Sequence, residues 1–299
     1  MIPTLRLAAC LGFFAVQLPA FAASATDYPI QLVRKSVVGE RYVVTIHGTQ
    51  EQTMTRTVNG NPVPGQDGLV IANLEATGEV LALTPSGHEA KVKLTVQKFS
   101  RTEAGRSGEV LAPGTELIVE RKGAKTEYLL GGKPVTPELA ATLELVGVEL
   151  GNDDSANDDQ VFGTKERKKP GDSWSVNAAA AAADISKMGL AVEPANMTGS
   201  TTLAEVVKTG SQEQLRIQGA LAIKNVSIPL PPGIAVKSSD MNVTYTGLFP
   251  VDLGQRVSQS GLSMVARIVC AGNLNGAELA MTITMKQSKD ATYTAFVAK

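Results

Sequence analysis

Strict alternation of apolar and polar residues is the feature of this 299-residue sequence that most restricts its fold. Residues 91–99 alternate in this way, with Val92, Leu94 and Val96 as the apolar set, and residues 214–223 and 279–286 repeat the pattern. Successive side chains of a strand point to opposite faces, so a period of two predicts strands with one dry and one wet face. That arrangement is typical of antiparallel sheets. We therefore expect a mainly β protein.

Turn-forming residues separate the alternating stretches. Asn59-Gly60, Gly131-Gly132 and Asn275-Gly276 tolerate the positive φ angles that tight turns need. Residues 229–233 (PLPPG) cannot join a sheet ladder, because proline has no N–H to donate. We expect this segment to be an extended loop.

Helix signals are few. Thr136 as N-cap and Pro137 at the first position predict one short helix. The alanine run at residues 178–183 predicts a second, although its flanks Val176 and Ile185 would also suit a strand. One or two short helices are therefore expected.

Three features recur in the same order, which indicates an internal duplication. Gly39-Glu40-Arg41-Tyr42 resembles Gly171-Asp172-Ser173-Trp174, which begins 132 positions later, and the turn glycines Gly87 and Gly123 have counterparts at Gly210 and Gly254. Coincidence is the alternative, because β-hairpins share turn residues.

The duplication predicts two similar curved antiparallel β-sheets or half-barrels. The N-terminal β half would span residues 26–150 and the C-terminal β half residues 171–299, with a charged linker loop at residues 151–170. Tyr42 and Trp174 would open corresponding strands, each filling the core at the end of its sheet.

Residues 1–25 have the order of an export signal. Arg6 precedes an apolar segment at residues 7–18, and small residues follow at Ala20-Phe21-Ala22 and Ala23-Ser24-Ala25. The apolar segment is shorter than the roughly 20 residues that a transmembrane helix needs. We expect cleavage near Ala22 or Ala25, a secreted or periplasmic protein, and no transmembrane span after cleavage. Lipidation of Cys10 is the weaker alternative, since the apolar segment would follow the modified residue.

Composition narrows the class of partner. The net charge of −1 provides no basic excess for a phosphate backbone, so no nucleic acid is expected.

Cleavage would leave Cys270 as the only cysteine, which we expect to be buried and unpaired; a reactive thiol is the alternative. Only ten aromatic residues would remain, so the interior should be aliphatic.

No motif in the sequence predicts a catalytic or metal-binding site. Asp153, Ser155, Asn157 and Asp159 space oxygen atoms as a Ca²⁺ loop does, but the turn glycine and the bidentate glutamate are missing and the basic residues 165–169 follow. A solvated charged loop is the better interpretation. His47 and His88 are the only histidines, too few for a zinc site. No Gly-x-Ser-x-Gly sequence occurs. We expect no catalytic, cofactor-binding or metal-binding residues, no cofactor and no enzyme activity.

Gly171-Asp172-Ser173-Trp174, residues 248–254 (LFPVDLG) and the paired glycine-rich hairpins resemble a family of exported bacterial envelope proteins of β-rich architecture and unknown function. The resemblance covers roughly residues 35–270, and the alanine run and residues 229–233 depart from it. It implies bacterial export and a β-rich body, and it implies nothing about chemistry.

Two hypotheses for the function follow. The first is an envelope protein whose sheets enclose an aliphatic cavity for a lipid or other apolar small molecule. The alternative is a non-catalytic structural or protein-interaction module of the envelope, with a filled core. A contiguous apolar cavity of ligand size would favour the first hypothesis.

Overall fold

The structure is a computed structural model that describes residues 26–297 except 124, 149, 152, 154–156, 188–189 and 210–211. The predicted signal segment, including Cys10, lies outside the described residues.

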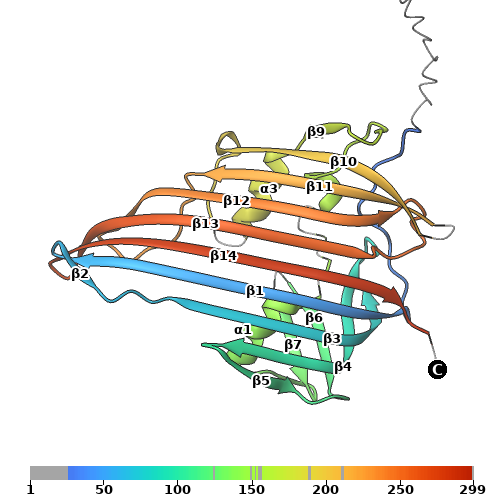
Figure 1. Cartoon of the computed structure of the whole chain (residues 1–299), viewed down its shortest axis with the longest axis horizontal. Helices are drawn as coiled ribbons and strands as arrows, with labels where there is room; N and C mark the ends of the chain where they lie inside the picture. The colour runs from blue at the N-terminus through green and yellow to red at the C-terminus, as the bar shows by residue number, and fades with distance from the viewer. Residues whose placement is uncertain are drawn as a thin grey trace, which may run out of the picture.

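Fourteen strands form one antiparallel sheet (Figure 1). The order across it is β8-β7-β6-β4-β3-β1-β14-β13-β12-β11-β10-β9, while β2 pairs with β1 and β5 with β4. The strands are β1 (Arg41–Val58), β2 (Asn61–Val63), β3 (Gly68–Leu83), β4 (Glu89–Glu103), β5 (Arg106–Leu111), β6 (Glu116–Lys122), β7 (Lys125–Leu130), β8 (Lys133–Pro134), β9 (Ser173–Ser175), β10 (Met197–Thr209), β11 (Gln212–Lys224), β12 (Ile234–Pro250), β13 (Gln259–Leu274) and β14 (Ala277–Ala295).

The prediction of two sheets or half-barrels is wrong, because β1 and β14 join the two halves of the chain. Their ladder runs without interruption from the Tyr42–Ala295 pair to the Val58–Leu279 pair. Alternation reports only which face a residue takes within its own strand. It carries no information about which distant strand becomes the neighbour.

Internal duplication stays a prediction. In both proposed repeats, consecutive long strands are neighbours, as β1, β3 and β4 are in one and β10, β11 and β12 are in the other. However, β1 lies in the middle of the sheet, whereas its proposed counterpart β9 is a three-residue strand at the edge.

The individual strand predictions are confirmed at residues 91–99, 214–223 and 279–286, which lie within β4, β11 and β14. In β4, a register shift places Lys98 opposite Glu75 and Val96 opposite Ala76, so Gln97 is the extra residue. Phe99 therefore joins Val96 on the buried face.

The described residues contain three α-helices, rather than one or two. They are α1 (Pro137–Val146), α2 (Asp158–Val161) and α3 (Ala178–Lys187), together with the 3₁₀ turn η1 (Pro194–Asn196). Thr136 caps α1 as predicted, since its hydroxyl accepts the Leu139 N–H at 3.3 Å. The alanine run is helical, in line with the high helix propensity of alanine. In the part of the chain that is described, no helix has the length and hydropathy to cross a membrane.

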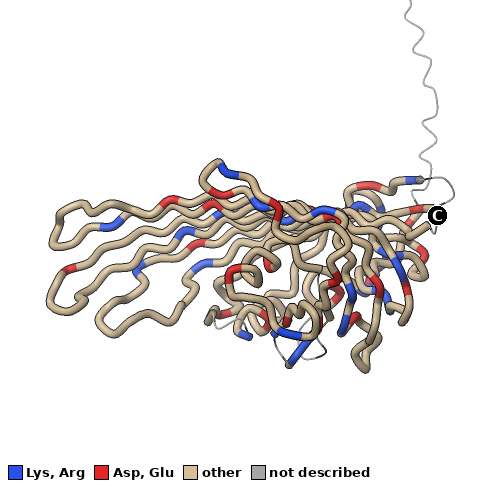
Figure 2. Tube along the Cα trace, turned by 90° about the horizontal axis from the view of Figure 1, so that it is seen from below, with Lys and Arg blue, Asp and Glu red and all other residues tan. Residues whose placement is uncertain are grey.

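The helices lie on one face of the sheet, which we call the inner face (Figure 2). Helix α1 packs on β1 and β3, where Val44 and Ile46 are fully buried, and α3 packs on β10. Gly48 allows the close approach of α1, because a Cβ there would lie 2.3 Å from the Leu145 carbonyl oxygen.

Both edges of the sheet are short strands. One edge is β8, which ends in Pro134, and the other is β9. Short edges and proline both limit pairing with another chain.

Candidate ligand-binding face

The inner face continues beyond the helices as a half-buried apolar surface. Residues that pair directly across antiparallel strands share a face, so the register extends the inner face from Ile46 along β1, β14 and β13. At its far end it presents half-buried apolar side chains, which we call the open strip: Met54, Val58, Met264, Ile268, Leu279, Met281, Ile283 and Met285.

The outer face at the same level is mostly polar. It carries Thr53 and Thr55 of β1, Thr282 and Thr284 of β14, and Arg267 of β13, although Val265 and Val269 of β13 are apolar residues on this face. The period of two that predicted strands thus separates a methionine-rich inner face from a threonine-rich outer face.

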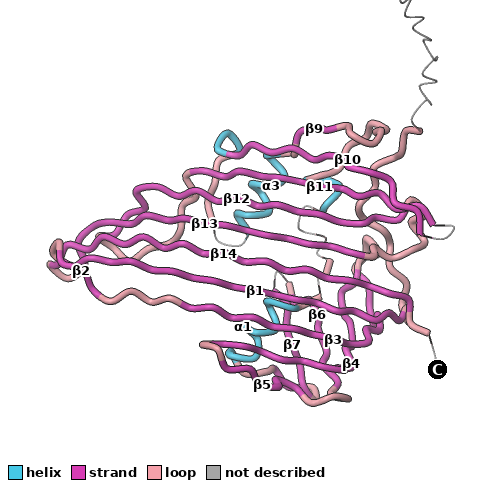
Figure 3. Tube along the Cα trace, in the orientation of Figure 1, coloured by secondary structure: helices cyan, strands magenta, loops and turns pink. Residues whose placement is uncertain are grey.

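The open strip has no second layer. Figures 1 and 3 place α1 and α3 behind one part of the sheet, while the far ends of β1, β13 and β14 extend past them. Figure 2 shows these ends projecting away from the helices and loops. None of the strip residues belongs to the three buried apolar clusters among the described residues. The strip therefore exposes part of its apolar surface, although Ala266 and Cys270, which lie beside its residues on the inner face of β13, are buried.

A cavity of about 1060 Å³ adjoins the strip under the helices. Leu262 and Lys289 of the inner face are part of its wall, and Met264 and Gln287 follow them on the same face. Ligand cavities commonly occupy roughly 300–1,000 Å³, so this one has ligand size.

Aromatic side chains gather at the cavity, contrary to the expected aliphatic lining. Its wall includes five of the ten aromatic residues that follow residue 25, namely Tyr128, Phe162, Tyr245, Phe249 and Tyr293. The rings of Phe162 and Tyr245 stack with centroids 5.5 Å apart, and Tyr245 contacts Phe249 at 6.1 Å. Burial raises the pKa of Tyr128 to about 12, so its hydroxyl stays protonated at neutral pH.

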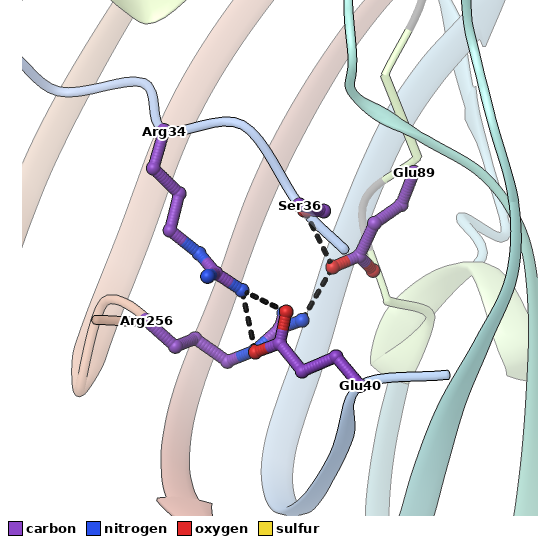
Figure 4. Close-up of polar contacts among 5 residues, drawn as sticks. All are labelled: Arg34, Ser36, Glu40, Glu89 and Arg256. Carbon is purple, nitrogen blue, oxygen red and sulfur yellow. Dashed lines mark hydrogen bonds and ion pairs between the residues drawn. The ribbon is translucent and has the colours of Figure 1, made fainter. Parts of the chain in front are cut away.

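A network of two arginines and two glutamates lies at one side of the cavity (Figure 4). Arg34 Nη2 donates to the Glu40 carboxylate at 2.6 Å. Arg256 donates from Nε to Glu40 at 3.2 Å and from Nη2 to Glu89 at 2.5 Å. Ser36 adds a hydrogen bond of 3.0 Å to Glu89. The network ties the segment before β1 to the start of β4 and to the β12–β13 connection.

The charges in this network balance. Burial would raise the pKa of Glu40, but the hydrogen bond from Arg34 and the charge of Arg256 outweigh it and hold that pKa below its ordinary value. Burial would lower the pKa of the Arg256 guanidinium, but the charge of Glu89 outweighs burial and raises that pKa. A neutral, internally paired set of groups is suited to holding three segments together.

The structure confirms two residue predictions and modifies a third. Cys270 is free and buried, on the inner face of β13. Tyr42 opens β1 and is 2% exposed. Trp174 opens β9, as predicted, but it is only half-buried, and its Nε1 donates to the Phe162 carbonyl at 2.8 Å.

The candidate calcium ligands serve other partners. Asp153 bonds to Ser86, and Asn157 caps α2. Asp159 accepts the N–H groups of Leu32 and Val33 at 2.6 and 3.3 Å. Ser155 lies outside the described residues.

The two histidines lie apart. His47, on the outer face of β1, shares a hydrogen bond of 2.6 Å with Asn73, whereas His88 is part of the cavity wall.

Sequence reasoning missed Arg256 and the open strip. It expected an apolar cavity, but it assigned no residue to the cavity wall. The alternation at residues 279–286 was a signal for the strip, because it already separated methionine, leucine and isoleucine from threonine and lysine. Arg256 had no such signal, since its partners are 167 and 216 positions away.

No family model matches the chain, and no curated protein matches its sequence. A structure concerned with lipid–protein interactions in lipovitellin is similar over 88% of this chain, with 6% identity and a TM-score of 0.34, and this chain spans 26% of that one. The OccK7 (OpdD) structure of Pseudomonas aeruginosa matches over 87% of this chain and 100% of that chain, with 8% identity and a TM-score of 0.22. An outer membrane channel from Pseudomonas putida F1 matches over 88% of this chain and 99% of that chain, with 10% identity and a TM-score of 0.18. None of these similarities identifies a family for the chain.

Proposed function

We propose that this protein is an exported, non-catalytic binder of an apolar ligand, which lies on the inner face of the sheet. The observation that carries the proposal is the open strip. Its apolar side chains are half-buried within the folded chain, and removing the remainder of their surface from water would favour association with a hydrocarbon.

The dimensions of the strip suit one hydrocarbon chain. From Leu279 to Met285 the inner face of β14 runs for about 20 Å at roughly 3.4 Å per residue. An acyl chain in a bilayer spans about half of the 30 Å hydrocarbon core, which is about 15 Å. The adjoining cavity offers further room. A lipid or another long-chain alkyl compound therefore fits as the ligand class.

Methionine is suited to such a surface. Met54, Met264, Met281 and Met285 supply flexible, polarisable side chains that adapt to ligands of differing shape. The proposal accordingly favours a class of alkyl ligands over a single compound.

The test is binding of alkyl alcohols of increasing length to the purified mature protein, measured by displacement of a neutral fluorescent probe. Affinity should rise with each methylene by up to about fourfold, because burying one methylene contributes about 0.8 kcal/mol. Native mass spectrometry should also detect co-purified lipid.

A pair of neighbouring variants provides the control. Ile283→Asp places a charge on the inner face and should weaken binding, whereas Thr282→Asp places it on the outer face and should leave binding unchanged. Thermal unfolding checks that both variants fold. Absence of alkyl binding, or equal effects of the two variants, would contradict the proposal and favour a structural or protein-interaction module.

A further inference from the structure

One charged residue stands within the apolar surface of the open strip. Arg56 of β1 is exposed and pairs with Met281 across the ladder, so both lie on the inner face. On β1 its neighbours along this face are Met54 and Val58.

On β1, β13 and β14, the inner face near Arg56 carries no carboxylate among the described residues. The inward positions of β1 from Gln50 to Val58, of β14 from Leu279 to Gln287 and of β13 from Met264 to Gly272 include one charged residue, which is Arg56. Glu51 and Lys286 lie on the outer face, where they pair at 3.1 Å. Arg56 makes no ion pair or side-chain hydrogen bond with a described residue.

We propose that the ligand of the open strip is a single-chain amphiphile with an anionic carboxylate or phosphate head, bound at Arg56. This inference rests on the proposed function and adds the chemistry of the head group. Arginine presents a planar set of N–H donors that matches both anions. Because Arg56 is exposed, the head group keeps contact with water while the tail lies on the apolar side chains.

The tail extends from Arg56 toward the cavity. In that direction the inner face passes Met54 and Ile283, then Met285, and reaches Met264 beside the polar pair Gln50 and Gln287. A single amphiphile fits better than a bilayer surface, because the helices and loops project from the same face beside the strip (Figure 2). A flat membrane could not lie on the whole strip.

The experiment compares three twelve-carbon probes: dodecanoate, dodecanol and dodecyltrimethylammonium. The wild-type protein should prefer dodecanoate to the cationic probe. Arg56→Gln should weaken dodecanoate binding by about fivefold, the upper range for an exposed ion pair, and leave dodecanol unchanged. Dodecyl phosphate should behave as dodecanoate does.

Arg267→Gln is the matched control. Arg267 is exposed on the outer face at the level of Thr284, and it also has no ion pair with a described residue. Arg267→Gln should leave the affinity for every probe unchanged.

Equal binding of the three probes, or equal effects of the two arginine variants, would overturn the head-group assignment and leave alkyl binding established. Vesicles test a bilayer as the alternative ligand. If Arg56→Gln lost binding to anionic vesicles but bound monomeric dodecanoate as wild type does, the assignment of a single amphiphile to Arg56 would also be overturned. Failure of every alkyl probe to bind would overturn the proposed function as well.

Discussion

The guanidinium carbon of Arg256 lies 3.8 Å from the centroid of the Tyr42 ring. This cation–π contact places the β12–β13 connection over the first residues of β1, which are 214 positions earlier in the chain. Glu40 and Glu89 accept hydrogen bonds from the same guanidinium. One side chain therefore links both halves of the sheet beside the cavity.

Removing Arg256 should strongly destabilise the fold. Arg256→Ala leaves the 7%-exposed Glu89 without its ion pair, and breaking a buried pair costs about 3–5 kcal/mol. Arg216→Ala is the control, because Arg216 pairs with the exposed Glu205 and should cost about 1 kcal/mol or less. Urea unfolding measures both. Similar losses for the two variants would show that the network adds little to stability.

The Glu40 carboxylate should make the free energy of unfolding depend on pH in the acidic range. Its folded pKa is lowered, so its contribution is fully present above the ordinary value of 4.5 and is lost as pH falls through the folded pKa. The free energy of unfolding of wild type should therefore approach that of Glu40→Gln between about pH 5 and pH 3. A difference between the two proteins that stays constant over this range would be inconsistent with a lowered pKa.

Gly78 should be required beneath the ring of Tyr42. A Cβ at residue 78 would lie 2.3 Å from Tyr42 Cζ, so Gly78→Ala should cost about 1–3 kcal/mol through overpacking. In a Tyr42→Leu background the ring is absent, so Gly78→Ala should lower the free energy of unfolding by less than it does in wild type. A double-mutant cycle by denaturant unfolding measures this coupling, and additive effects would argue against the contact.

The export signal predicts two cleavage sites. N-terminal sequencing of the protein secreted from a bacterial host should give Ala23 or Thr26 as the first residue. Changing Ala20 and Ala22 together to leucine should leave Thr26 as the only start. A secreted protein that begins at Met1 would contradict the prediction.

Local sequence determined the elements of this protein. Alternation placed the strands at residues 91–99, 214–223 and 279–286, and Thr136 with Pro137 placed the start of α1. These signals succeed because side-chain direction and helix capping depend on neighbours within a few residues. The same alternation also determined the two chemically different faces, since every paired strand inherits its period.

Tertiary structure alone decided how these elements combine. The ladder between β1 and β14, which begins at the Tyr42–Ala295 pair, joins the strands into one sheet where the sequence predicted two. The same pairing brings Arg256 within hydrogen-bond distance of Glu40 and Glu89. The lengths of the helices then decided which part of the inner face stays uncovered, and so created the open strip. Such outcomes depend on which of many similar strands become neighbours and on how far each covering helix extends, and no short stretch of sequence encodes either.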